Sequence, residues 1–271
     1  MSNDAASILV TGAGGLIGRA LVDLGLPGCP HTVLHETGGV PAGVRTIIHA
    51  GRDPRLGKAD YDPDRDVESV AAKIAAERGL DLVMLSSRKV YGDAPSPVTE
   101  EAPARPTDDY GRQKRAMEMR LQERLGAKLT ILRIANVFSF EPGRRSFFGI
   151  MLDRLRDCGE IHFDMSPDTA RDFIPLTATA EIIRTLALSP PGGIVNVGSG
   201  VPLATGDLAR AVMDGFGSGR LTCTDDTIRD SFVLDVTRMH SLTGLHLTRD
   251  RILAAARTIG ATLKAGTATP A

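Results

Sequence analysis

The chain has 271 residues, which is enough for one large α/β domain or for one domain with a smaller lobe. Its hydrophobic content of 42% and charged content of 24% are ordinary for a globular protein, and a net charge of −1 gives no field that would attract nucleic acid or an anionic membrane. The three cysteines (Cys29, Cys158 and Cys223) form no CxxC or Cys/His cluster, and no apolar run approaches the ~20 residues of a membrane span. Because the first residues also lack the pattern of a signal peptide, we expect a cytoplasmic protein with no metal, no nucleic-acid partner and no membrane partner.

Strand-like and helix-like runs alternate along the first half of the chain. Strands are predicted at 7–11, 32–36, 45–50, 81–86 and 128–135, and helices at 19–24, 62–78 and 109–125. This alternation predicts an α/β fold in which a doubly wound parallel sheet carries helices on both faces. After about residue 136 the elements shorten. We therefore assign 1–140 mainly to a nucleotide-binding domain and 141–271 mainly to a small C-terminal substrate lobe interwoven with the main sheet.

A glycine-rich turn joins the first strand to the first helix, with the sequence TGAGGLIG at 11–18. In this context Gly12 allows a sharp turn, Gly15 lets the main chain approach a pyrophosphate, and Gly18 lets the helix pack against the strand. The helix N-terminus then offers free N–H groups to the phosphates. The pattern predicts a Rossmann-type dinucleotide site, and a glycine-rich loop without a ligand is the alternative.

Tyr110 and Lys114 lie four residues apart at the start of a predicted helix and therefore on one of its faces. A nearby ammonium lowers the pKa of a tyrosine from its usual value near ~10, so the pair can transfer protons. The alternative is a surface pair on an amphipathic helix. Ser86 and Ser87 end the strand at 81–86, where a hydroxyl can bind a substrate oxygen or simply cap the strand.

Six motifs occur in one order: TGAGGLIG at 11–18, SSRKVYG at 86–92, YGRQK at 110–114, LRIAN at 132–136, RDFIPL at 171–176 and NVGSG at 196–200. Together they resemble the extended short-chain dehydrogenase/reductase superfamily, in its NAD-dependent epimerase/dehydratase branch. The resemblance implies a catalytic triad of Ser87, Tyr110 and Lys114. It also implies hydride transfer between a sugar carbon and nicotinamide, with Tyr110 moving the hydroxyl proton.

Cofactor contacts are assigned, with NAD as the expected cofactor, to Gly12, Gly15, Leu16, Ile17, Gly18, Glu36, Ala50, Gly51 and Lys114. NAD is favoured because an acid at the end of the second predicted strand accepts hydrogen bonds from the ribose and repels a 2′-phosphate. NADP remains open, since Glu36 is alternatively an exposed strand-end residue and the short 37–44 segment removes part of the family's adenine pocket.

Substrate contacts are assigned to Arg88, Asn136 and Arg171, the last of which matches a family arginine that holds a nucleotide-sugar pyrophosphate. An ion pair with Asp168 or Asp172 is the alternative for Arg171. Family dehydratases carry an Asp-Glu pair where this chain has Arg88 and Lys89, so dehydration is disfavoured. C4 epimerisation, reduction of a keto sugar and oxidation of a hydroxyl are left, and a nucleotide sugar is the preferred substrate.

Two alternatives stay open at this point. The substrate can be a free sugar or sugar acid, and the chain can be a nucleotide-binding relative that has lost catalysis. A homodimer through the helices at 62–78 and 109–125 is a further expectation. Met117, Met119 and Leu121 fit such an interface, but they fit an ordinary core equally well.

Overall fold

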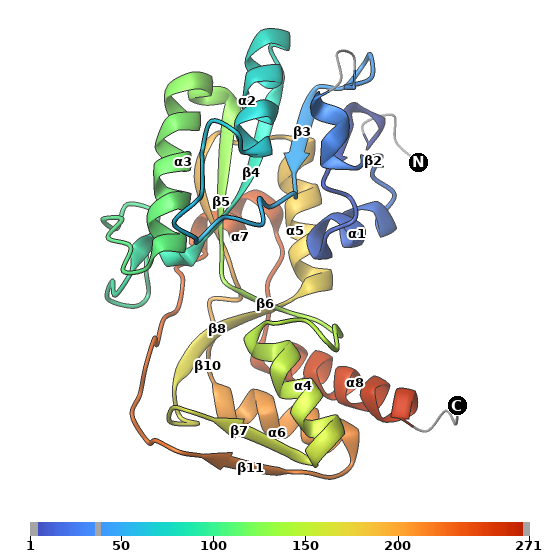
Figure 1. Ribbon diagram of the computed structural model, residues 1–271, viewed down its shortest axis with the longest axis vertical. Helices are drawn as coiled ribbons and strands as arrows, with labels where there is room; N and C mark the ends of the chain where they lie inside the picture. The colour runs from blue at the N-terminus through green and yellow to red at the C-terminus, as the bar shows by residue number, and fades with distance from the viewer. Residues whose placement is uncertain (1–4, 36–38, 268–271) are drawn as a thin grey trace. The chain divides into compact units, whose positions relative to one another are not determined.

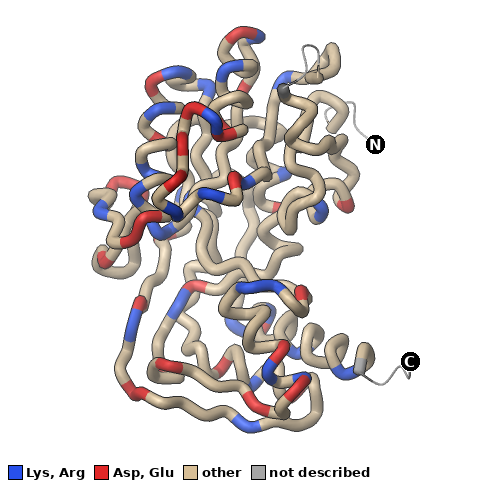
Figure 2. The backbone as a smooth tube through the Cα atoms, viewed as in Figure 1, with Lys and Arg blue, Asp and Glu red and all other residues tan. Residues whose placement is uncertain are grey.

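The computed structural model describes residues 5–35 and 39–267, which divide into two units. Unit 1 consists of Met1–Ala135, Leu176–Val197 and Asp235–Leu245, and unit 2 of Asn136–Pro175, Gly198–Leu234 and His246–Ala271. The chain therefore passes between the units several times, and segments from beyond residue 140 belong to unit 1. Figure 2 shows basic and acidic residues interspersed along both units, as the net charge of −1 suggests.

Unit 1 is built on a six-stranded parallel sheet with the strand order β2-β1-β3-β4-β5-β9. The strands are β1 (Ile8–Thr11), β2 (Gly28–Cys29), β3 (Thr46–His49), β4 (Asp81–Ser87), β5 (Leu129–Ile134) and β9 (Gly193–Val197). Figure 1 shows α2 (Val67–Arg78) and α3 (Asp109–Leu125) beside one face, and α1 (Leu16–Asp23) and α5 (Leu176–Leu188) beside the other. The helix α7 (Thr237–Thr243) packs against α5. The predicted doubly wound sheet is confirmed.

The strand ends explain where a ligand can lie. Residues in the middle of β1, β3 and β4 are buried because helices cover both faces, so these strands read as continuous apolar runs. The strands run parallel, and their carboxyl ends therefore share one edge of the sheet. The loops after β1, β3 and β4 meet at that edge, which is where open α/β sheets bind their ligands.

Two predicted elements of unit 1 differ from the structure. The predicted strand at 32–36 is wrong: β2 ends at Cys29, and His31–His35 forms the 3₁₀ helix η2. Pro30 lacks the N–H that would continue the ladder. The helix predicted from residue 62 begins at Val67, because Asp66 caps it by accepting a hydrogen bond from the Glu68 N–H at 2.9 Å. The helix predicted at 109–125 is α3, which Asp108 caps.

Unit 2 combines a three-stranded sheet, in the order β10-β8-β6, with a parallel pair, β11-β7. Its strands are β6 (Asn136–Phe138), β7 (Glu160–Phe163), β8 (Ala170–Pro175), β10 (Pro202–Ala204) and β11 (Arg220–Cys223). The helices α4 (Phe147–Cys158), α6 (Thr205–Phe216) and α8 (Arg249–Thr267) enclose its own apolar core. Buried Asp172 ties this unit together, since it accepts hydrogen bonds from the backbone of Ser199, Gly200 and Leu234.

The remaining short elements are the 3₁₀ helices η1 (Ala5–Ser7), η3 (Arg88–Tyr91) and η4 (Gly126–Lys128). Of these, η3 directly follows β4 and lies against α3. Across residues 5–35 and 39–267, none of the helices has the length and apolar character that crossing a bilayer requires.

Candidate active site

The glycine-rich turn after β1 packs closely against the backbone that follows β3. Gly12 has φ +76°, and a Cβ on it would lie 2.3 Å from the backbone nitrogen of Gly51. A Cβ on Gly18 would lie 2.2 Å from the Gly12 carbonyl oxygen. Neither position tolerates a side chain, because backbone atoms occupy the space. The structure therefore brings three of the predicted cofactor residues together, namely Gly12, Gly18 and Gly51.

The outer side of this turn is bare. Gly15 is the N-cap residue of α1 and carries no side chain to cap it, while Leu16 and Ile17 begin the helix. A Cβ built on Gly14 would meet nothing within 4 Å. The first N–H groups of the helix and a backbone without side chains are what a pyrophosphate needs, so the predicted residues fit a dinucleotide. Glu36, which is assigned to the ribose, lies outside the described residues.

The loop after β3 continues this surface. The Ala50 N–H donates to the Thr11 carbonyl at 2.8 Å, which holds the end of β3 beside the glycine turn. Below it, buried His49 shares a 2.8 Å hydrogen bond between its Nδ1 and the Thr11 hydroxyl. Burial first, and then the positive charges of Lys114 and His31, lower the pKa of His49 to about 3. His49 is therefore a neutral part of the floor, and it is a residue that the motifs did not point to.

Ser86 and Ser87 have different surroundings although they are neighbours at the end of β4. Ser86 is buried and donates its hydroxyl to Glu118 at 2.6 Å, so it belongs to the interior of the unit. Ser87 is half-buried, and its Oγ accepts a hydrogen bond from the Lys89 N–H at 3.2 Å, which starts η3. A hydroxyl that accepts this bond keeps its own O–H to donate. Ser87 is therefore both a cap and a candidate substrate ligand.

Tyr110 lies in the first turn of α3 and is half-buried. The guanidinium carbon of Arg52, on the loop after β3, lies 5.3 Å from the centre of its ring, which is within cation–π range. The backbone of Gly57 also comes close to the Tyr110 side chain. The segment between β3 and α2 thus lies against the ring at the carboxyl edge of the sheet.

Lys114 lies one turn further along α3 and is almost fully buried. Its Nζ donates to Glu68 Oε2 at 2.9 Å and to the Leu85 carbonyl at 3.1 Å. Burial is the largest single influence and lowers the pKa of Lys114, but the charges of Glu68 and Tyr110 and the hydrogen bond to Glu68 together outweigh it, so the net pKa lies above its ordinary value. The lysine is therefore charged and fixed. Its partner, Glu68, is a residue that the sequence motifs did not indicate.

The three predicted substrate residues fall in both units. Arg88 is buried in η3 of unit 1, and Asn136 begins β6 of unit 2. Arg171 in β8 is 8% exposed, and its Nη2 lies 3.6 Å from Asp230 Oδ2. The same side chain donates to the carbonyls of Asp230 and Arg229, each at 3.2 Å, and lies over the ring of Phe147.

The ion pair foreseen as the alternative for Arg171 exists, but its acid is Asp230 and not the neighbouring Asp168 or Asp172. Asp172 instead turns toward Ser199, whose backbone and hydroxyl both donate to it at 2.7 Å. Burial raises the pKa of Asp172, although these hydrogen bonds oppose the shift. A partner 59 positions away in sequence could not be found from the local pattern.

No three His, Cys, Asp or Glu side chains in the described part of the chain are arranged to hold a metal ion. The site in unit 1 consists instead of the glycine-rich turn at 11–18 together with Gly51, which we call the glycine cradle, and of Ser87, Tyr110 and Lys114 along one edge of the sheet. Such an arrangement can bind an anionic nucleotide and move a proton.

A family model described as the RmlD substrate binding domain matches residues 58–188, from the loop before α2 to the end of α5. No curated protein sequence matches the chain at a significant level. Solved structures, in contrast, match almost the whole chain at low sequence identity.

Three of these solved structures illustrate the likeness. UDP-N-acetylglucosamine 4-epimerase from Methanobrevibacter ruminantium M1 matches with a TM-score of 0.80 and 18% identity, over 96% of this chain and 99% of that one. A NAD dependent NDP-hexosamine 5,6-dehydratase of tunicamycin biosynthesis, TunA, matches with a TM-score of 0.76 and 21% identity, over 93% and 96%. RMD from Pseudomonas aeruginosa, complexed with NADPH, matches with a TM-score of 0.76 and 20% identity, over 96% and 100%.

The fold and the cradle define a Rossmann-type α/β protein with a second, smaller unit. The comparisons confirm the resemblance that the motifs suggested: the chain has the fold of the extended short-chain dehydrogenases/reductases.

Proposed function

We propose that this chain is an NAD(P)-dependent oxidoreductase or epimerase that transfers a hydride at a carbon of a sugar, preferably a nucleotide sugar. One observation carries the proposal. The charged, buried Lys114 lies four residues after Tyr110, at the same edge of the sheet as Ser87 and the interlocked glycines. The three solved structures named above support it, because they are an epimerase of a nucleotide sugar, a dehydratase of a nucleotide sugar and a complex with NADPH.

In this mechanism the bound nicotinamide supplies the hydride chemistry. The glycine cradle and the N-terminus of α1 hold the pyrophosphate, and Lys114 has one N–H left for the ribose beyond its contacts with Glu68 and Leu85. Tyr110 takes the proton from the hydroxyl of the reacting carbon, or returns it. Ser87 donates to the same oxygen and orients it. The positions after Ser87 are Arg88 and Lys89, so no carboxylate there serves an elimination, which favours epimerisation or reduction.

The cofactor is proposed to be NAD, with NADP as the alternative. The TunA structure is described as NAD dependent and RMD was solved with NADPH, so both cofactors occur among proteins of this fold. The free-sugar substrate also remains as an alternative to the nucleotide sugar.

A second candidate function is a nucleotide-binding relative without catalysis. One observation favours it: the carboxylate of Glu68 opposes the charge with which Lys114 would act on Tyr110. Binding of the dinucleotide would then persist, and only proton transfer at Tyr110 would be missing.

The first experiment measures the nicotinamide content of the purified protein by denaturation and chromatography, followed by titration of the emptied protein with NADH and NADPH. Retained NAD supports an epimerase, which must keep its cofactor through a full cycle. An empty protein that binds NAD(P)H supports an exchanging reductase. A protein that binds neither cofactor contradicts the proposal.

The second experiment separates the two candidates. Tyr110→Phe keeps the ring but removes the proton-transferring hydroxyl, so NADH affinity should persist. Turnover of a UDP-sugar panel should fall about 10²- to 10⁴-fold, the usual contribution of general acid–base catalysis. If turnover by the wild type is found and survives the substitution, Tyr110 is not the acid/base.

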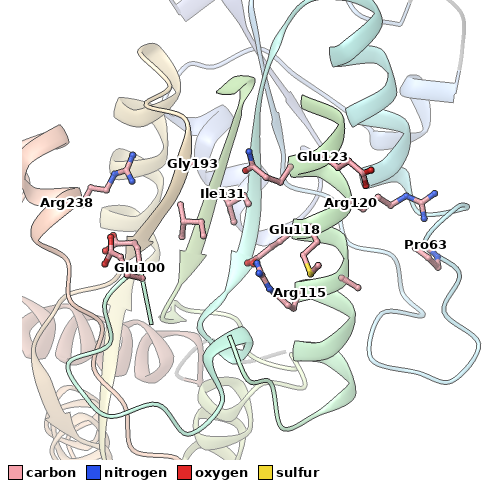
Figure 3. Close-up of a pocket in the computed structure, with 14 residues that line it drawn as sticks. Pro63, Glu100, Arg115, Glu118, Arg120, Glu123, Ile131, Gly193 and Arg238 are labelled. Carbon is pink, nitrogen blue, oxygen red and sulfur yellow. The ribbon is translucent and has the colours of Figure 1, made fainter. Parts of the chain in front are cut away.

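We further propose a homodimer through the outer face of α3. Met117 and Leu121 are buried in the core of unit 1, which leaves Met119, 58% exposed, as the apolar residue of that face. An open groove of about 1250 Å³ runs beside it (Figure 3). Acidic and basic side chains alternate along this groove, among them Glu100, Glu123, Arg115, Arg120 and Arg238.

A two-fold axis through this face would bring acids of one copy against bases of the other, since both copies use the same patch. Light scattering should then give the mass of a dimer for the wild type and of a monomer for Met119→Glu, with Met119→Leu as the matched control. A wild type that is monomeric at micromolar concentration contradicts the interface.

A further inference from the structure

A buried ion pair under the start of α3 carries an inference beyond the triad. Glu68 is the second residue of α2, and its backbone N–H is fixed by the cap Asp66 at 2.9 Å. Its carboxylate meets Lys114 at 2.9 Å, and the two residues are only 3% and 4% exposed. Two helices that follow different strands therefore bring opposite charges together in the interior of unit 1.

The pair is incompletely satisfied. Oε1 of Glu68 is buried and has no hydrogen-bond partner among the described residues, while Oε2 binds Lys114. A half-bonded buried carboxylate costs stability, because its desolvation is only partly repaid. Lys114 uses one N–H for Glu68 and one for the Leu85 carbonyl, so its third N–H is left for a ligand at this edge of the sheet.

We propose that Glu68 is a positioning residue that acts through Lys114: it fixes the ammonium beside the carboxyl end of β4 and keeps it charged for the nicotinamide ribose and for Tyr110. This inference rests on the proposed function. It gives a reason for retaining a costly pair that an apolar residue at each position would avoid.

The other groups around Lys114 cannot replace Glu68. Asp66 also raises the pKa of Lys114, but its carboxylate accepts hydrogen bonds from the Tyr61 hydroxyl at 2.7 Å and from the Glu68 N–H. On β3, burial first and then Lys114 itself keep the pKa of His49 at about 3, so that ring stays neutral.

Two groups on α3 itself also reach the pair. Tyr110 raises the pKa of Lys114 less than Glu68 does. Burial raises the pKa of Glu68 most, the charge of Lys114 opposes that shift, and Glu118 adds only a smaller rise. Without Glu68, the largest influence that raises the pKa of Lys114 is lost, so we expect burial to bring that pKa down.

The test compares NADH affinity between about pH 6 and about pH 10 for the wild type, Glu68→Gln and Glu77→Gln. Glutamine keeps the shape and an acceptor oxygen at position 68. Glu77, an exposed carboxylate on the same helix, is the matched control because it pairs only loosely with Lys73, at 3.9 Å. In Glu68→Gln the affinity should fall about tenfold or more toward the alkaline end, as the ammonium is lost. Both other proteins should keep a common, flatter profile. Parallel profiles for all three proteins would overturn the proposal, since a merely structural pair would not make binding depend on pH.

A second readout needs no cofactor. Lysine side-chain carbons of the protein without nucleotide can be followed by NMR, with Lys114 assigned from Lys114→Arg. We expect its titration to move down by about 2 pH units or more in Glu68→Gln. A shift below half a unit would overturn the proposal. A wild type that fails to bind NADH would instead contradict the proposed function, so the two failures are distinguishable.

Should Glu68→Gln fail to fold, Glu68→Asp takes its place. The shorter carboxylate keeps the charge but moves the ammonium, so NADH binding should weaken about tenfold at every pH. Unchanged affinity in this variant would overturn the positioning role.

Discussion

Two buried ion pairs occupy successive turns of α3 and differ in how completely they are bonded. Lys114 meets Glu68 from α2, whereas Glu118, four residues later, meets Arg133 from β5. Glu118 is fully buried and accepts hydrogen bonds at both oxygens, from the Ser86 hydroxyl, from Arg133 Nε and Nη2, and from Arg115 Nη1. Glu68 binds through one oxygen only.

The Arg133 side of the second pair is equally well held. Its guanidinium carbon lies 4.6 Å from the centre of the Tyr91 ring, and the Tyr91 hydroxyl donates to Asn196 Oδ1 at 2.7 Å. One network thus joins α3 to β5, η3 and β9. A saturated network of this kind makes the fold rigid, whereas the half-bonded pair one turn away keeps a donor for chemistry. On the same helix, Glu118 and Arg133 thus form a structural pair, whereas Glu68 and Lys114 form a working pair, meaning one that keeps a donor for a ligand.

The largest effect is expected from a substitution that breaks the fully bonded pair of Glu118 and Arg133. Glu118→Gln leaves the Arg133 charge buried without its carboxylate, so the free energy of unfolding should fall by about 3–5 kcal/mol. Urea titration followed by circular dichroism measures it. Glu123→Gln, an exposed change on the same helix, should stay within about 0.5 kcal/mol of the wild type. A loss below about 1 kcal/mol for Glu118→Gln would show that the network is not what holds α3.

The half-bonded pair should cost less to break. In Glu68→Gln one bond to Lys114 is weakened, but a carboxylate oxygen that already lacks a partner is removed, so we expect a loss of only about 1–3 kcal/mol at neutral pH. The same urea titration measures it. If this variant loses more stability than Glu118→Gln, the division into a structural and a working pair is wrong.

His49 gives a pH test of the surroundings of Lys114. Its pKa is lowered from 6.5 to about 3 by burial first and then by Lys114 and His31. Between these two pH values, His49 is therefore neutral in the folded protein but protonated in the unfolded chain. Its contribution is complete above pH 6.5 and is lost as the pH falls toward 3. Linkage gives a loss of about 2 kcal/mol between about pH 7.5 and about pH 5.

The measurement is the difference in pH dependence between the wild type and His49→Asn, both followed by urea unfolding. In His49→Asn, the free energy of unfolding should lack the part of its pH dependence that His49 contributes. His162→Asn makes the same chemical change in unit 2 and sets the background. Equal slopes for the wild type and His49→Asn would mean that His49 takes up its proton in the folded state.

The close packing of the glycine cradle can be tested by adding a Cβ at a crowded and at an open position of the turn. Gly18→Ala places a Cβ 2.2 Å from the Gly12 carbonyl and should destabilise by about 1–3 kcal/mol, as overpacking does. Gly14→Ala meets nothing within 4 Å and is the matched control in the same turn. Thermal unfolding of both variants checks this. Equal stabilities would contradict the interlock.

The sequence was sufficient for this cradle but not for the ion pairs, and the reason is distance along the chain. The turn between β1 and α1 depends on residues within eight positions, so its glycines reveal it. Glu68 lies 46 positions from Lys114, and a glutamate in the first turn of a helix looks like an ordinary exposed residue. Burial decides its role, and no local pattern records burial.

The same reasoning explains the errors in strand and partner assignment. The run at 32–36 has the composition of a strand, but Pro30 ends β2 before it. Arg171 has acids on both sides in sequence, yet it pairs with Asp230, which only the folding of unit 2 brings near. Alternation predicted the parallel sheet because it repeats along the whole first half of the chain.

The smallest expected effect concerns the cation–π contact between Arg52 and the ring of Tyr110, which lies outside the two buried ion pairs. Its guanidinium carbon lies 5.3 Å from the ring centre, and Nη2 donates to the Leu56 carbonyl at 3.2 Å. A double-mutant cycle of Arg52→Ala with Tyr110→Leu, measured as free energies of unfolding in urea, should give a coupling energy of about 0.5–1 kcal/mol. This is the usual size of an exposed cation–π contact. Arg52→Ala with Tyr110→Phe keeps the ring and is the control, so that cycle should couple far less. Equal coupling in both cycles would mean that Arg52 acts on the hydroxyl. In that case the charge that matters at Tyr110 would come from the exposed loop as well as from Lys114.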